Sequence, residues 1–231
     1  QLPKEAIETV NSFTDLYYHE LNQTNILESG REWWGEYIAA KPTGWQVRLA
    51  DVITNSEAIF STQVMVGAPA VTNVSWTVNT QTLGQQSIQG VPQGRYALRG
   101  RKSFERFQFK ANPINDVLFF EVTYDAKGQN SAQAYLDFFT LQVQRRLTVA
   151  ANQQSYFLLS NQTEKPRQLQ FQEPLPNDCL LWDITSIESP KFVPVDLATS
   201  TTPSYTTSQR FQHLHSFSVG NAYEPPFLQK V

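Results

Sequence analysis

Apolar and polar residues alternate in short runs along most of the chain, which is the pattern of β-strands with one buried face. The longest run is Ala134–Leu147. At a period of two, the residues of this run that share one face are Tyr135, Phe139, Leu141, Val143 and Leu147. Leu136 and Phe138 make the opposite face apolar in the first half of the run, so we expect this strand in the interior of a sheet.

Asp137 lies in the most apolar part of the same run. A buried carboxylate is costly unless a partner satisfies it. The arginines that are candidates for this partner are Arg48, Arg145 and Arg146.

Turn residues separate further runs of the same kind between Trp45 and Val149, and this region has few helix signals. The predicted strands are 45–53, 59–68, 73–79, 86–90, 95–100, 103–111, 116–126 and 134–147. Many short strands with regular turns are typical of an antiparallel β-sandwich. The sequence therefore predicts an all-β, jelly-roll-like sandwich followed by a smaller β unit.

The change of pattern along the chain predicts a division into three parts. Residues 1–44 form an N-terminal segment that we expect to pack on the sandwich, and residues 45–150 form the sandwich itself. After Val149 the strands become shorter and more interrupted, at 154–161, 167–172, 179–185, 189–195 and 209–219. Residues 151–231 therefore form the smaller β unit, and the polar stretch 198–208 reads as a loop.

Composition and charge exclude several classes of protein. The chain has 231 residues, of which 40% are hydrophobic and 17% charged, with a net charge of −3 and one cysteine, Cys179. No basic field is present to hold nucleic acid, and no internal disulfide can form. No run of apolar residues is long enough to span a bilayer. No charged-then-apolar signal segment opens the sequence, and we expect the chain to be part of a longer protein.

Few residues are candidates for chemistry. The sequence has no serine-hydrolase, phosphate-loop or zinc-peptidase motif, and it predicts no catalytic residue, no metal and no cofactor. The least ordinary stretch is Ser29–Glu36, SGREWWGE, where charged residues flank two tryptophans. Its structural or partner-contact candidates are Arg31, Glu32, Trp33, Trp34 and Glu36, to which Asp137 is added. We expect the two indoles to plug the sandwich while Arg31 and Glu36 form an ion pair; exposed indoles would instead stack on sugar rings.

The segment 17–38, YYHELNQTNILESGREWWGEYI, resembles a segment of the type IX secretion sortases, a gingipain-like group of C25 cysteine peptidases from Bacteroidota. Three later stretches resemble landmarks of the same family in the same order: 134–147, 180–193 and 217–231. The last of them resembles the link that leads into the peptidase domain. The resemblance covers the chain from about residue 13 to its C-terminus.

The resemblance implies that this chain is a non-catalytic N-terminal β region, because the family's catalytic histidine and cysteine lie in a later, caspase-like domain. It implies a place on the extracellular face of the outer membrane. The implied partners are that peptidase domain, cargo sorting domains, other secretion-system proteins and lipopolysaccharide. The alternative function is a carbohydrate-binding module, which requires an exposed aromatic row formed by Trp33, Trp34, Trp45 and Trp76.

Overall fold

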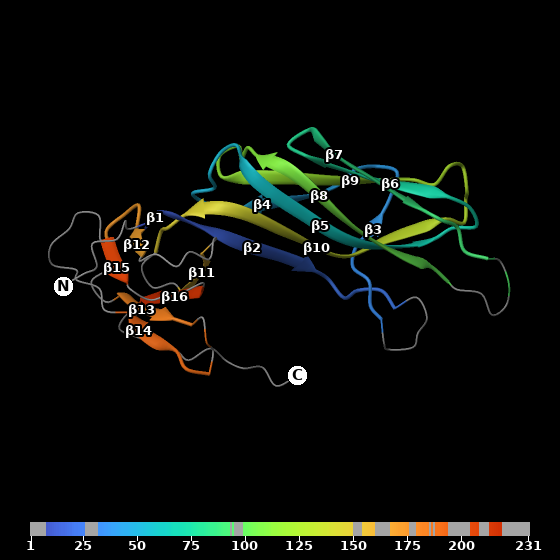
Figure 1. Ribbon diagram of the computed structural model, residues 1–231. Coiled ribbons are helices and arrows are strands. Elements are labelled where there is room, and N and C mark those ends of the chain that lie inside the picture. The colour runs from blue at the N-terminus through green and yellow to red at the C-terminus, as the bar shows by residue number, and fades with distance from the viewer. Residues whose placement is uncertain are drawn as a thin grey trace. The chain divides into compact units, whose positions relative to one another are not determined.

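The computed structural model describes residues 8–25, 32–92, 94, 99–149, 154–159, 167–175, 179–184, 186, 188–193, 204–207 and 213–218. Every regular element in these ranges is a β-strand (Figure 1). Contacts divide the chain into two compact units. The larger unit is Leu16–Gln144, and the smaller unit combines Gln1–Asp15 with Arg145–Val231. The boundaries that the sequence predicts at residues 44 and 150 stay a prediction.

Two packed sheets form the larger unit. One sheet has the order β2 (Ser12–Glu20), β10 (Gln133–Arg146), β5 (Ser56–Gly67) and β8 (Arg101–Ala111), and the short β3 (Tyr37–Ile38) also pairs with β10. The other sheet has the order β4 (Thr43–Arg48), β9 (Val117–Asp125), β6 (Thr72–Val78) and β7 (Gln81–Ile88). The chain passes repeatedly from one sheet to the other, for example from β8 to β9 and on to β10. This arrangement confirms the predicted β-sandwich.

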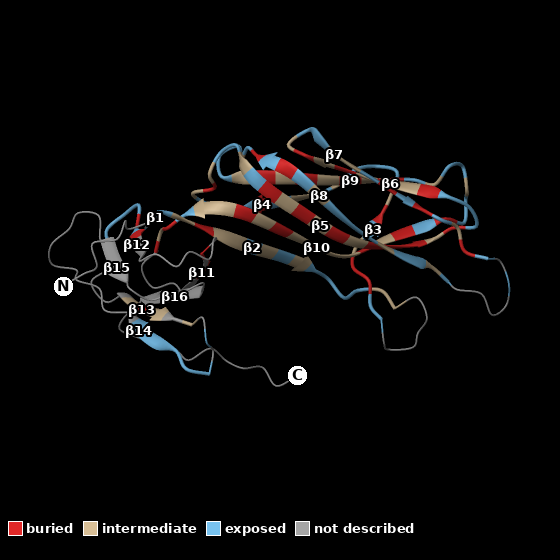
Figure 2. Cartoon of the chain, in the orientation of Figure 1, coloured by how far each residue is buried: buried red, intermediate tan, exposed pale blue. Residues whose placement is uncertain are grey.

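Alternation and turn chemistry explain why these residues form these strands. In β6 buried and partly exposed residues alternate strictly, so that Val74, Trp76 and Val78 face the core (Figure 2). Asn55 and Asn79 occupy the left-handed backbone region between strands, with φ angles of 62° and 44°. Asparagine tolerates this conformation better than most residues.

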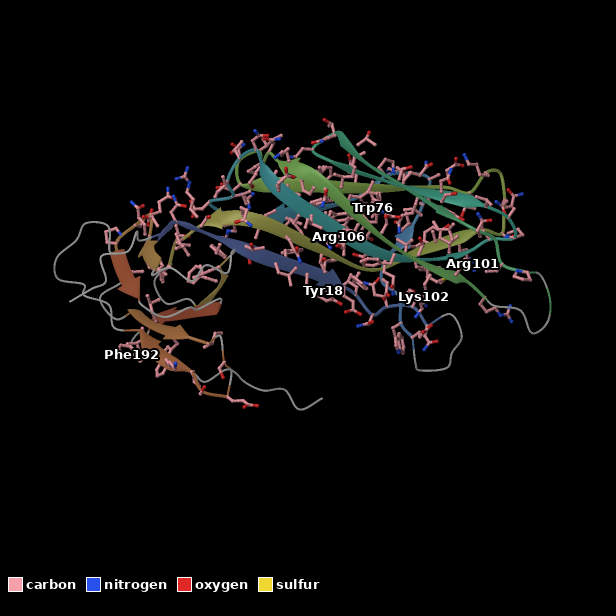
Figure 3. The ribbon with its side chains drawn as sticks, in the orientation of Figure 1. Tyr18, Trp76, Arg101, Lys102, Arg106 and Phe192 are labelled. Carbon is pink, nitrogen blue, oxygen red and sulfur yellow. The ribbon has the colours of Figure 1, made fainter. Side chains whose placement is uncertain are left out.

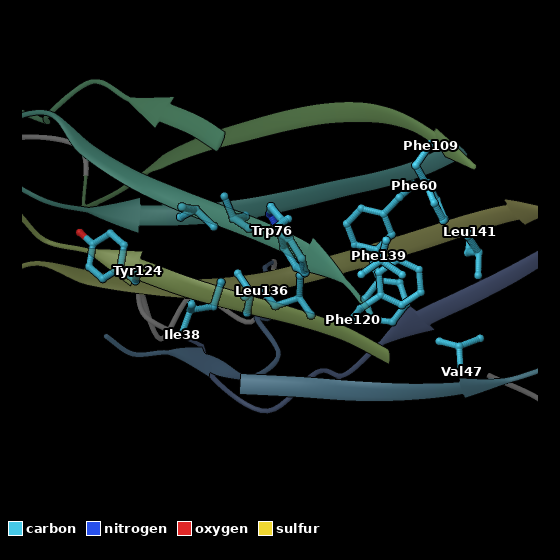
Figure 4. Close-up of a cluster of buried hydrophobic side chains, with 14 of the residues drawn as sticks. Ile38, Val47, Phe60, Trp76, Phe109, Phe120, Tyr124, Leu136, Phe139 and Leu141 are labelled. Atoms are coloured by element: carbon cyan, nitrogen blue, oxygen red, sulfur yellow. The ribbon is translucent and has the colours of Figure 1, made fainter. Parts of the chain in front are cut away.

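Aromatic rings fill the core of the larger unit (Figure 4). The Phe60 ring lies 4.7 Å from that of Phe120, 4.9 Å from that of Trp76 and 5.4 Å from that of Phe139, measured between ring centroids. These residues come from β5, β9, β6 and β10, so the cluster joins the two sheets. As predicted, β10 lies in the interior of its sheet.

The predicted faces of β10 are wrong in its first half because the strand contains a β-bulge. The register with β5 shifts between Leu136 and Phe138, which leaves Asp137 as an extra residue. The residues of β10 that face the core are therefore Ala134 and Leu136 before the bulge, and Phe139, Leu141 and Val143 after it. Tyr135 lies on the opposite face from Phe139, whereas the unbroken period of two placed them together.

The smaller unit contains two groups of paired strands. One group joins β1 (Glu8–Val10) in parallel to β12 (Arg167–Gln170), and β12 pairs antiparallel with β15 (Ser204–Thr207). β15 lies within 198–208, where the sequence predicted a loop. The other group has the order β14 (Lys191–Val193), β13 (Cys179–Asp183), β16 (His213–Ser218) and β11 (Gln154–Leu158). The smaller unit has a hydrophobic core of its own, which includes Phe13, Leu147, Phe157, Phe171 and Leu181.

Candidate functional site

The segment that contains Trp33 and Trp34 lies alongside the first half of β10. The Gly35 amide donates to the carbonyl of Leu136 at 2.7 Å, and the Leu136 amide donates to the carbonyl of Glu36 at 2.9 Å. The Trp34 amide also donates to the carbonyl of Thr24 at 2.8 Å. These backbone hydrogen bonds hold the segment in place independently of its side chains.

The two adjacent tryptophans have different environments. Trp34 is 5% exposed, and the ammonium of Lys102 lies 5.3 Å from its ring centroid, within cation–π range. Lys102 also forms an ion pair with Glu32, with 2.6 Å between Nζ and Oε1. Trp33 is 45% exposed. In register, Lys102 is opposite Met65 on the outer face of the sheet, so Trp34 packs beside that face.

Glu36 closes one open side of the sandwich, between β2 and β4. Its Oε1 lies 2.7 Å from Nε2 of His19 and accepts a hydrogen bond from Nε1 of Trp45 at 2.9 Å. The His19 ring in turn stacks on Phe139, with 4.8 Å between centroids. Arg31 lies outside the described residues, so the predicted ion pair between Arg31 and Glu36 stays a prediction.

A second group of hydrogen bonds, made by Gln86, closes the other side of the sandwich, between β7 and β8. The indole Nε1 of Trp76 donates to Oε1 of the buried Gln86 at 2.9 Å. Nε2 of Gln86 donates to the carbonyl of Ser103 at 3.1 Å. Trp45 and Trp76 stack on each other at 6.1 Å between centroids, so the two groups of hydrogen bonds are joined through these rings in the core. Sequence reasoning missed both groups of hydrogen bonds, because their members lie on different strands and no local spacing pairs them.

The predicted arginine partner of Asp137 is wrong. Nε2 of Gln63 donates to Oδ2 of Asp137 at 2.5 Å, whereas Arg145 pairs with Asp15 at 2.6 Å and Arg48 donates to the carbonyl of Asn115 at 3.3 Å. The bulge turns Asp137 to the outer side of the sheet, where an amide suffices as its partner. Desolvation is the main reason why the pKa of Asp137 is raised above its ordinary value, and the hydrogen bond from Gln63 opposes that rise.

Exposed aromatic side chains gather on the outer face of the same sheet. The Phe138 ring lies 5.8 Å from that of Tyr18 and 6.5 Å from that of Phe104, between centroids. The Tyr18 hydroxyl donates to Glu20, which is the main reason why the pKa of Tyr18 is raised to about 12. Sequence reasoning missed this group, although Phe104 has the same alternation phase as Arg106 and so belongs to the polar face of its strand.

The exposed row of indoles that the carbohydrate-binding alternative requires is not formed. Trp76 is buried, Trp34 is nearly so, and Trp45 packs against the core. Trp33 alone among these four tryptophans is largely exposed.

Within the described parts of the chain, no group of three or more histidine, cysteine, aspartate or glutamate side chains could hold a metal ion. The same described ranges contain no helix with the length and apolar character needed to cross a bilayer.

Comparison with known proteins supports the fold. No protein-family model matches the sequence, and no curated protein is similar to it in sequence. Among solved structures, dimeric latent PorU from Porphyromonas gingivalis is similar, with a TM-score of 0.75 and 15% sequence identity. The similarity covers 94% of this chain and 21% of the PorU chain. At this identity the similarity concerns the fold alone, and the chain spans about one fifth of the length of PorU.

A carbohydrate-binding domain is also similar, but only weakly. It is the CBM36-1 domain of a multidomain xylanase from the hindgut metagenome of Trinervitermes trinervoides, with a TM-score of 0.33 and 11% identity. The similarity covers 57% of this chain and 96% of that domain. A TM-score this low carries no argument about shared fold or function.

Proposed function

We propose that this chain is a non-catalytic β region of a type IX secretion sortase similar to PorU. The observation that carries the proposal is the structural similarity over 94% of the chain to a fifth of the PorU chain. The order of the sequence motifs from residue 17 to residue 231 supports the same assignment independently. In this proposal the parent protein is a C25-type cysteine peptidase on the extracellular face of the outer membrane.

The proposed role of the region is to support the peptidase domain of the same protein. A sandwich whose open sides are closed by Glu36 and by Gln86 is a rigid platform for a neighbouring domain. We propose as further partners of this region cargo sorting domains, other secretion-system proteins and lipopolysaccharide. The chemistry itself belongs to the peptidase domain, and we assign no catalytic residue to this chain.

A binding experiment tests this role. The chain would be immobilised and presented with the peptidase domain from the same gene, and separately with a cargo sorting domain. We expect the peptidase domain to be retained at micromolar concentration and the isolated chain to show no peptidase activity. Failure to retain either partner would refute the proposed role. Retention of the sorting domain alone would make the region a cargo receptor, which contradicts the supporting role.

A further inference from the structure

The strand β8 (Arg101–Ala111) is the longest edge strand of the larger unit. It ends the order β2–β10–β5–β8, and no described strand pairs with its second side. β8 has 11 residues, whereas the edge strands of the other sheet, β4 and β7, have 6 and 8. An unpaired edge presents a row of backbone donors and acceptors with which a further strand can pair.

Several devices that commonly block such an edge are absent from β8. Its register with β5 continues from Arg101 opposite Val66 to Ala111 opposite Ser56 without a bulge. The strand is long and contains no proline. Bulges, prolines and short strands are the usual means of preventing pairing at an edge. The edge of β8 is therefore regular enough to continue the sheet by one strand.

Between Arg101 and Lys110, the described groups that hydrogen-bond to the backbone of β8, apart from those of β5, are side chains. They lie 3.1–3.3 Å from their partners and are Gln86 at the carbonyl of Ser103, Glu105 at the amide of Arg106, and Asn112 at the carbonyl of Lys110. The bonds of Glu105 and Asn112 are exposed and join neighbours in the sequence. An incoming strand can therefore replace these two bonds without disturbing the core.

The charge on β8 selects which strand can pair with it. Successive side chains point to opposite faces of a sheet, and the charged residues of β8 on the outer face are Lys102, Arg106 and Lys110. All three are cationic, and the anionic Glu105 has the opposite phase. Cationic side chains on an edge repel a second edge of the same kind. The edge therefore opposes pairing with a second copy of β8 and favours an acidic strand.

The outer face of β8 also has an alternating pattern. Lys102 is paired with Glu32, whereas the guanidinium of Arg106 has no ion pair with a described residue. Figure 3 shows Lys102 near the start of β8 and Arg106 farther along the strand. Phe104 lies between them in the sequence and is 56% exposed. An added strand therefore meets a cation, an aromatic ring and a second cation at alternate residues.

We propose that β8 binds an extended acidic segment of another protein as an additional strand of the sheet. Backbone hydrogen bonds along β8 hold the segment. Two acidic side chains lie beside Lys102 and Arg106, and an apolar side chain between them lies beside Phe104. The residues that alternate with these three are neutral, because Glu105 repels an acid on the other face. This inference does not rest on the proposed sortase role, and either can fail without the other.

Titration of the 231-residue protein with a labelled heptapeptide, followed by fluorescence anisotropy, tests the inference. The probe is threonine–glutamate–threonine–valine–threonine–glutamate–threonine with blocked ends, and the control peptide has lysine in place of both glutamates. We expect saturable binding of the probe at submillimolar concentration and no binding of the control peptide. Arg106→Glu should weaken probe binding about tenfold, because an attractive cross-strand pair becomes repulsive. Lys41→Glu makes the same change of charge at an exposed position before β4 and should leave binding unchanged.

Methylated peptides distinguish strand addition from attraction by charge alone. In an added strand, alternate backbone amides point toward β8 and away from it. Methylation of one alternate set of amide nitrogens should abolish binding of the probe, and methylation of the other set should preserve it. Hydrogen exchange should also become slower at amides of β8 when the probe binds, while the amides of β4 keep their rates.

Three results would overturn the inference. The first is the absence of saturable probe binding at millimolar concentration. The second is equal binding of the two methylated peptides, which would reduce the interaction to charge. The third is self-association of the protein in sedimentation that Arg106→Glu abolishes, which would assign the edge to a second copy of this chain. Near-UV circular dichroism verifies that each variant retains the wild-type fold.

Discussion

Alanine substitutions at Tyr135 and Leu136, made one at a time, test the bulge in β10 most sharply. The bulge places Leu136 in the core of the larger unit, where its side chain is 0% exposed. Tyr135 lies on the outer face and contacts Tyr37 edge to face, with 5.4 Å between the ring centroids. An unbroken alternation through Asp137 would instead place Tyr135 in the core and Leu136 outside.

The structure gives different magnitudes for the two substitutions. Leu136→Ala removes a fully buried side chain and leaves a cavity, which costs about 2–5 kcal/mol. Tyr135→Ala loses one aromatic contact and limited burial, which costs about 1 kcal/mol. In a domain of this size, each 1 kcal/mol lowers the melting temperature by about 2–4 °C. Leu136→Ala should therefore melt well below Tyr135→Ala.

Urea unfolding measures both free energies. Tryptophan fluorescence reports on the larger unit through the buried Trp76, and the two variants should have equal m-values if both unfold from the same native state. The pair Phe139→Ala and Phe138→Ala should show the same contrast, with the larger loss at Phe139. A greater loss for Tyr135→Ala than for Leu136→Ala would refute the bulge and the faces assigned to β10.

Three further predictions concern the polar groups. Glu36→Ala should cost about 1–3 kcal/mol in urea unfolding because two partly buried nitrogens, His19 Nε2 and Trp45 Nε1, lose their partner, whereas Glu32→Ala, which breaks an exposed ion pair, should cost less than about 1 kcal/mol; equal losses would contradict the closing role. Ultraviolet titration of the phenols should show one tyrosine with a pKa of about 12 that Glu20→Gln moves toward the ordinary value, since Tyr18 donates to that carboxylate; an unchanged titration curve would contradict the assignment. The raised pKa of Asp137 means that the folded state binds its proton more tightly than the unfolded chain, so its contribution to stability is complete below the ordinary pKa and is lost as pH rises through the raised value. Asp137→Asn should therefore gain stability relative to the wild type in urea unfolding as the pH rises from below the ordinary pKa of 3.8 to neutral pH; a relative loss over that range would reverse the sign.

Alternation and turn residues were sufficient to predict the sandwich and the interior place of β10. The bulge was not predictable from these signals, because Asp137 is an ordinary residue for a polar position and the apolar residues around it fit either phase. The strand β15 was also missed, since its sequence SYTT is polar and its place depends on pairing with β12. Pairing of this kind is a tertiary effect that local patterns do not contain.

The candidate site was predictable from the sequence only in part. The charged and aromatic character of the stretch from Glu32 to Glu36 indicated a structured segment, and the backbone hydrogen bonds to Leu136 show how it is held. The partners of Glu36 come from β2 and β4, far away in the sequence, and no local spacing predicts them. The exposed aromatic group formed by Tyr18, Phe138 and Phe104 was indicated in the sequence only by Phe104, which lies on the polar phase of its strand.

The coding sequence that follows Val231 tests the central claim most directly. The account predicts that the reading frame continues into a caspase-like domain that contains a histidine and a cysteine at its catalytic positions. A reading frame that ends there, or that continues into a domain without such a pair, would contradict the assignment to a sortase.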